Sequence, residues 1–233
     1  MSSAGGSKSV SNYEQLLRDA INASGGHRQV FGGEEVWNTL FSSLDLIGDT
    51  ELAIHSYLTM NEVKDEGTCY LIIYGVLQTM LLQQDAAKAI ASALGVKVKL
   101  SPGLVEIRKI RNSAAGHPTK QTEYGRVTAS VITRNSIRWN EFELVTMTTD
   151  ILQDQRKRIN TESLARDQAR YICEVLEKVI QEVQDREQEH RNKFVTTQRA
   201  STNAPCDGSN ARPASASDSA TITLRFCFFA VET

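Results

Sequence analysis

Apolar residues recur every three or four positions in several long segments of the chain, and this spacing predicts amphipathic helices. The segments cover residues 13–23, 34–47, 51–60, 66–94, 102–116 and 162–193. In the segment 66–94, the stretch from Cys69 to Leu77 is apolar nearly all round, which is typical of a helix at the centre of a bundle. Gly48 and Asp49 are expected to separate two of the helices, and Gly95 to end the long one.

Between the last two helical segments the pattern changes to that of strands. Residues 126–148 hold two runs rich in β-branched side chains, and the polar residues Arg134, Asn135 and Ser136 separate them. This predicts a small β-hairpin inserted between helices. The expected fold is therefore mainly α, a helical bundle with a small inserted β-hairpin at about 126–148.

Composition divides the chain into one domain with a flexible segment at each end. Residues 1–10 are rich in Ser and Gly, and residues 196–220 are rich in Ser, Thr, Asn, Ala and Pro, with little apolar content to offset the entropy lost on ordering. We therefore expect a helical domain over 11–195 and a disordered tail over 196–233. The apolar stretch 221–231 near the end has no strand partner in the pattern, and no role is assigned to it.

Charge and cysteine spacing exclude several classes of protein. The 233 residues carry a formal net charge of -2, so any binding of nucleic acid must come from a local basic patch. No apolar run approaches the roughly 20 residues that span a bilayer, and the first residues lack a signal-peptide pattern, so we expect a cytoplasmic protein with no membrane partner. The 4 cysteines are too widely spaced for a zinc site, and no metal or cofactor is expected.

The residues with the strongest chemical signal lie at the end of the segment 102–116. At about 100° per residue, Arg111 shares one side of its helix with apolar residues, where a cation needs a partner or access to an anion. These apolar residues are Leu104, Ile107, Ile110 and Ala114. His117 follows the helix break at Gly116 and can turn back toward Arg111. An imidazole and a guanidinium suit transesterification of RNA, but a simple helix cap and exit turn would give the same spacing.

The stretch Arg111-Asn112-Ser113-Ala114-Ala115-Gly116-His117 resembles the signature of the HEPN superfamily, an arginine, a polar residue, a short spacer and a histidine. Residues 74–78, 83–86 and 187–194 are similar to uncharacterised bacterial HEPN-like proteins, and the resemblance covers about 65–194. It implies a compact helical bundle that often forms a homodimer and cuts RNA without a metal. Arg111 and His117 would be catalytic, and Asn112 would orient them or bind phosphate.

A local basic rim near this motif is the expected RNA-binding surface. Its residues are Arg108, Lys109 and Lys120, with Arg126 as a further member. For these residues an ordinary solvated surface explains the pattern equally well. Family members that pair with an antitoxin modify a tyrosine close after the histidine, whereas Pro118 and Thr119 follow here, so that form of regulation is not expected. A partner protein that neutralises the ribonuclease in another way is a further hypothesis.

Three readings remain open at this stage. The first is an RNA endonuclease of HEPN type in defence or stress response, which acts as a homodimer and leaves 2′,3′-cyclic phosphate ends. The second is a helical module that binds a partner protein or a nucleotide without catalysis, which the modest charge favours. The third is a structural dimerisation domain in which Arg111 forms a buried ion pair with Glu66 or Asp85.

Overall fold

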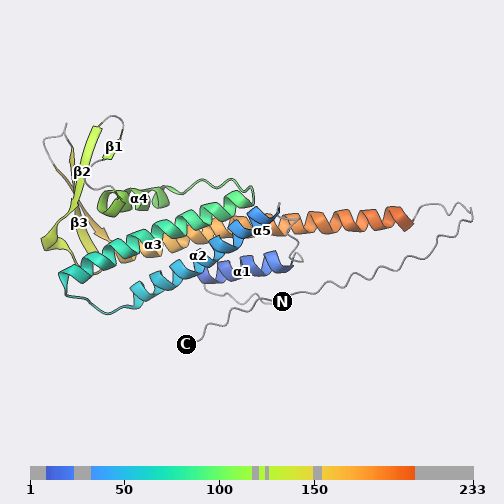
Figure 1. The fold of residues 1–233 in the computed structure, drawn as a ribbon, viewed down its shortest axis with the longest axis horizontal. Coiled ribbons are helices and arrows are strands. Elements are labelled where there is room, and N and C mark those ends of the chain that lie inside the picture. The colour runs from blue at the N-terminus through green and yellow to red at the C-terminus, as the bar shows by residue number, and fades with distance from the viewer. Residues whose placement is uncertain (1–8, 24–32, 117–120, 124–125, 149–153, 203–233) are drawn as a thin grey trace, which may run out of the picture. The chain divides into compact units, whose positions relative to one another are not determined.

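The computed structural model describes residues 9–23, 33–116, 121–123, 126–148 and 154–202. The described chain is mainly helical with an antiparallel sheet, as expected (Figure 1). In chain order the elements are α1 (Val10–Ala23), α2 (Glu34–Thr59), α3 (Glu66–Ala93), α4 (Pro102–Arg111), the π-helix η1 (Asn112–Gly116), β1 (Gln121–Glu123), β2 (Arg126–Ile132), the 3-10 helix η2 (Arg134–Ser136), β3 (Glu141–Thr148), β4 (Gln155–Asn160) and α5 (Thr161–Thr202).

Helix α2 is one continuous helix, so the prediction of two helices separated by Gly48 and Asp49 is wrong. A glycine inside a helix costs only about 1 kcal/mol relative to alanine. Buried residues on both sides of Gly48, including Leu44 and Ile54, pack into the common core and offset that cost. Tertiary packing therefore overrides the local signal for a break.

Helix α3 begins and ends where the sequence predicts. The Asp65 carboxylate accepts a hydrogen bond from the backbone N–H of Thr68 at 2.7 Å, which caps the N-terminus. At the other end Gly95 has a φ of 65°, the left-handed conformation that favours glycine after a helix. Between these ends Ile73, Leu77 and Met80 are fully buried, so α3 lies in the core as its apolar composition indicates.

Polar contacts fix how the helices run against α3. Glu51 on α2 accepts a hydrogen bond from Gln83 on α3, and Gln168 on α5 donates to the carbonyl of Met80. Helix α4 runs antiparallel to α3 (Figure 1), because residues later in α4 contact residues earlier in α3. Helix α3 is thus in contact with α2, α4 and α5.

The sheet has four strands in the order β1-β2-β3-β4, all antiparallel. The pair β2 and β3 is the predicted hairpin, with Val131 opposite Val145. Strands β1 and β4 were not predicted. Strand β1 has only three residues, and β4, with the sequence Gln-Arg-Lys-Arg-Ile-Asn, has only Ile159 buried. Cross-strand ion pairs support this edge strand, with Arg156 3.2 Å from Glu143 and Arg158 2.6 Å from Glu141.

At the two ends of the domain the described helices extend past the predicted bounds. Val10 is the first residue of α1 and is fully buried. Helix α5 continues to Thr202. The chain divides into two compact units, 1–192 and 193–233, and residues 1–8 and 203–233 lie outside the described residues. Among the described helices, none has the length and apolar character needed to cross a membrane.

Candidate functional site: a partly buried arginine between α3 and α4

Helix α4 carries Arg111 on its buried side. Ser101 caps the helix by accepting a hydrogen bond from the N–H of Leu104 at 3.3 Å. The apolar residues that share a side with Arg111 are all in the core, namely Leu104, Ile107, Ile110 and Ala114. Arg111 itself is partly buried. The predicted placement of a cation on an apolar helix face is therefore correct.

The Arg111 guanidinium is held by two amide side chains. The Oε1 atom of Gln78 on α3 accepts hydrogen bonds from Nε of Arg111 at 3.1 Å and from Nη2 at 2.6 Å. The Oδ1 atom of Asn112 accepts a bond from Nη1 at 3.1 Å. Both acceptors are uncharged, so these contacts fix the orientation of the guanidinium and leave its positive charge in place.

Gly116 lies against the same guanidinium. A Cβ atom built on Gly116 would be 2.5 Å from Nη1 of Arg111 and 3.3 Å from Oδ1 of Asn112, so any side chain at 116 would displace the arginine. The approach is made possible by η1, a π-helical turn that starts directly after Arg111, and such turns often occur at functional sites. His117, the predicted catalytic partner, lies outside the described residues.

Arg108 lies one turn before Arg111 and has a different kind of partner. Its Nε donates to Oε1 of Gln84 at 2.9 Å, and its Nη2 forms an ion pair with the carboxylate of Asp85. Asp85 was one of two carboxylates considered for Arg111, and it is engaged by Arg108 instead. Within the part of the chain that the structure describes, no carboxylate is bonded to Arg111.

A buried glutamine network next to Arg108 was not predicted from the sequence. Gln83, Gln84 and Gln168 are fully buried. Gln84 donates to Oε1 of Gln168 at 2.8 Å, and Gln168 donates to Oε1 of Gln83 at 2.9 Å. The network links α3, α4 and α5. A signal was present, since Gln168 lies four residues after Leu164 on the apolar side of its helix.

At its far end the network reaches Glu51 on α2. Nε2 of Gln83 donates to Oε2 of Glu51 at 3.4 Å. Burial raises the pKa of the Glu51 carboxyl, and the hydrogen bond from Gln83 acts in the opposite direction. Every buried side-chain polar atom among the described residues has a partner, so the network is fully satisfied and joins α2, α3, α4 and α5.

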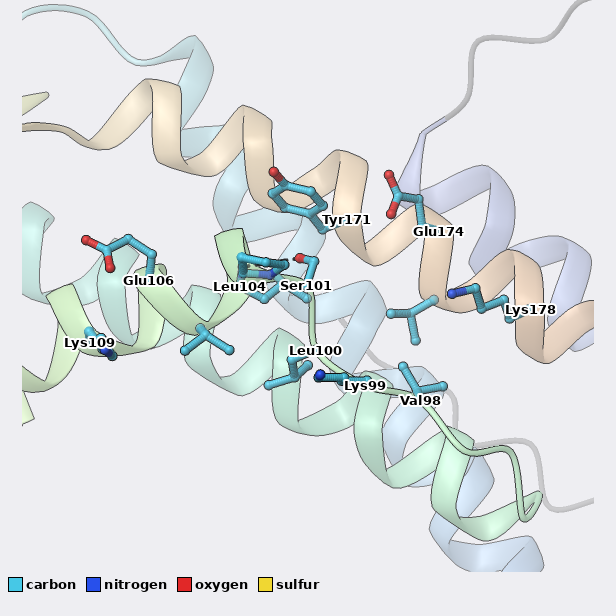
Figure 2. Close-up of a pocket in the computed structure, with 13 residues that line it drawn as sticks. Val98, Lys99, Leu100, Ser101, Leu104, Glu106, Lys109, Tyr171, Glu174 and Lys178 are labelled. Carbon is cyan, nitrogen blue, oxygen red and sulfur yellow. Dashed lines mark hydrogen bonds between the residues drawn. The ribbon is translucent and has the colours of Figure 1, made fainter.

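Of the other residues of the predicted basic rim, Lys109 has a described side chain and Arg126 does not. Lys109 lines a cavity of about 660 Å³ at the other end of α4, between residues 98–109 and α5. Figure 2 shows Tyr171, Glu174 and Lys178 on the α5 side of this cavity. Its lining includes both lysines and glutamates but neither Arg111 nor Asn112. Lys120 lies outside the described residues.

The arrangement around Arg111 suits the binding of an anion. A guanidinium has five N–H donors, and the three hydrogen bonds described above leave two of them, one on each terminal nitrogen. These remaining donors carry a full positive charge and can donate to the oxygens of a phosphate. Comparison with protein-family models, with curated proteins and with solved structures found no match for this chain.

Proposed function

We propose that the protein is a metal-independent endoribonuclease of HEPN type. The observation that carries the proposal is the state of Arg111, which is oriented by amide oxygens of Gln78 and Asn112 and keeps its charge. A partly buried arginine of this kind can bind an anion, whereas an arginine paired with a carboxylate has its charge neutralised within the protein. Arg108, with Asp85, is the local example of that second solution.

The proposed reaction is cleavage of RNA by its own 2′-hydroxyl group. His117 takes the 2′-hydroxyl proton, the 2′-oxygen bonds to phosphorus, and the bond to the 5′-oxygen breaks as the protonated His117 returns that proton to the leaving oxygen. Arg111 binds the non-bridging oxygens and offsets the charge that develops on them. The products are a 2′,3′-cyclic phosphate and a 5′-hydroxyl end, and no metal takes part.

A homodimer through α3 is part of the proposal. Leu71 is 73% exposed, Tyr74 40% and Leu82 37%, which is unusual for the central helix of a domain. At helical spacing these residues share one side of α3 with Gln78, the residue that holds Arg111. A second copy docked on this side would cover the apolar side chains and bring two Arg111 sites close together. Light scattering should find a dimer that the Leu71→Glu variant converts to a monomer.

The decisive experiment is cleavage of total cellular RNA by the purified protein in excess EDTA. The wild type should cut RNA and leave cyclic phosphate ends, whereas Arg111→Ala and His117→Ala should be inactive. Arg166→Ala is a matched control, since Arg166 is an exposed arginine on α5, and this variant should keep full activity.

Failure of cleavage would support the alternative function. If the wild type does not cut, the protein is a non-catalytic helical module, and if both variants cut as well as the wild type, the cutting does not come from Arg111 and His117 and the proposed site is wrong. The exposed apolar side of α3 would then be its binding surface, because burying Leu71 and Tyr74 favours a protein partner whether or not RNA is cut.

A further inference from the structure

Gln78 and Arg111 form an unusual pair, because one amide oxygen accepts two hydrogen bonds from the same edge of a guanidinium. The two distances, 3.1 Å to Nε and 2.6 Å to Nη2, place Oε1 where one carboxylate oxygen would lie in an arginine–carboxylate pair. A glutamate at position 78 would have nearly the same shape and could make the same bonds. The difference between the two residues is one negative charge.

That charge decides what the arginine can do. With a carboxylate at position 78, Arg111 would be neutralised within the protein, and an incoming phosphate would have to compete with it. With an amide, the guanidinium has the same orientation but keeps its charge for a ligand. Arg108 and Asp85 show that the same helix pair also contains the neutralised arrangement.

The remaining donors of Arg111 fit this interpretation. Gln78 occupies the edge formed by Nε and Nη2, and Asn112 takes one hydrogen of Nη1. One hydrogen on Nη1 and one on Nη2 are left, and these two nitrogens are bonded to the same carbon atom. The anchored edge and the free donors are therefore on different parts of one rigid plane.

We propose that Gln78 is a positioning residue that fixes Arg111 through a neutral acceptor and so reserves its charge for a phosphate group. The inference rests on the proposed function, in which this phosphate is a phosphodiester of RNA. Gln78 does not touch the ligand. It acts through Arg111, and its amide character is the property that matters.

The test compares Gln78→Glu, Gln78→Met and Arg111→Ala with the wild type. Gln184→Glu is the matched control, because Gln184 is exposed on α5 and its replacement adds the same charge far from the site. Binding is measured by fluorescence anisotropy with a 2′-O-methyl RNA oligonucleotide, which cannot be cut, at several salt concentrations. Cleavage of the unmodified oligonucleotide in EDTA and thermal unfolding complete the set.

Gln78→Glu should unfold at the wild-type temperature or above, because it gains an ion pair, and yet bind RNA at least about 10-fold more weakly. The dependence of log Kd on log salt concentration should become shallower by about 0.7, the value for one lost phosphate contact on a single strand. Gln78→Met keeps the charge but frees the guanidinium, so it should lower kcat more than it raises KM. A merely structural role predicts instead that activity follows the unfolding temperature in both variants.

Two outcomes separate this inference from the proposed function. If RNA is cut and Arg111→Ala abolishes cutting, but Gln78→Glu binds and cuts like the wild type, the ribonuclease stands and the role of Gln78 is overturned. If nothing is cut, but Arg111→Ala and Gln78→Glu both lose binding while Gln184→Glu keeps it, catalysis is excluded and the role of Gln78 is upheld.

Discussion

Arg108 and Arg111 lie one turn apart on the same side of α4, and they are held in chemically different ways. Arg108 is bonded to a glutamine oxygen and to the carboxylate of Asp85, whereas Arg111 is bonded to the amide oxygens of Gln78 and Asn112. The first arrangement cancels the charge of the arginine and joins two helices. The second orients the arginine without cancelling its charge, which is the condition for binding an anion.

The close approach of Gly116 to Arg111 predicts a variant that loses function without losing stability. In Gly116→Ala the new Cβ would lie 2.5 Å from Nη1, and the flexible end of the arginine can move away at little cost. We expect a change of less than about 1 kcal/mol in the free energy of unfolding, and RNA binding about 10-fold weaker. Gly75→Ala is the control, since a Cβ at Gly75 meets nothing within 4 Å. Unchanged RNA affinity in Gly116→Ala would contradict the placement of Arg111.

Gln168 should be critical for stability because it is the centre of the buried network. Replacement by leucine removes bonds to Gln83 and Gln84 and to the carbonyl of Met80. Unsatisfied buried polar groups cost about 1–3 kcal/mol each, so Gln168→Leu should lower the free energy of unfolding by about 3 kcal/mol in urea denaturation. Gln184→Leu, at an exposed position of the same helix, should change it by less than about 0.5 kcal/mol. Equal stability of the two variants would show that the network does not hold the helices.

Glu51 should make the stability depend on pH. Burial raises the pKa of its carboxyl, so the folded protein binds this proton more tightly than the unfolded chain does. The stabilising contribution of the protonated form is complete below the unfolded pKa, about 4.3, and is lost as the pH rises through the folded pKa. Glu51→Gln should therefore stabilise the protein at pH 7 and have little effect in acid, where the native carboxyl is neutral. Thermal unfolding measured from acid to pH 7 tests this prediction, and the exposed Glu62→Gln variant is the control. An equal gain in stability at every pH would contradict the raised pKa of Glu51.

Tyr57 on α2 and Thr161, the first residue of α5, share a hydrogen bond between their hydroxyl groups. The direction of this bond determines which of the two replacements should cost more stability. The Thr161 hydroxyl donates to the carbonyl of Asn140 at 2.9 Å, so its hydrogen is used and Tyr57 must be the donor between the two hydroxyls. Burial raises the pKa of Tyr57 to about 12, so the phenol keeps this hydrogen at neutral pH. Tyr57→Phe removes one bond, whereas Thr161→Val removes two and leaves the buried Tyr57 hydroxyl without its acceptor, while the carbonyl of Asn140 still accepts from the backbone N–H of Thr161.

We therefore expect a loss of about 1 kcal/mol in the free energy of unfolding for Tyr57→Phe and of about 2–3 kcal/mol for Thr161→Val, measured by urea denaturation. A larger loss for Tyr57→Phe than for Thr161→Val would mean that the direction of the bond is the reverse. Thr59→Val, at an exposed position near the end of α2, should be close to neutral.

The sequence by itself determined the features that depend on neighbours within one or two turns. The start of α3 at Glu66, its end before Gly95 and the apolar side of α4 that carries Arg111 all follow from the pattern along the chain. The hairpin of β2 and β3 was predicted for the same reason, because its two runs are adjacent in sequence. Such signals are local, and helix and strand geometry converts them directly into structure.

Only the tertiary structure decided which residues meet. Gln78 and Arg111 lie 33 positions apart, and Gln84 and Gln168 lie 84 positions apart, so no local spacing could pair them. The continuity of α2 through Gly48 and the addition of the charged strand β4 to the sheet also depend on contacts with distant elements. Long-range packing selects partners by burial and by the satisfaction of polar groups across elements, and the pattern along a single helix or strand does not contain that information.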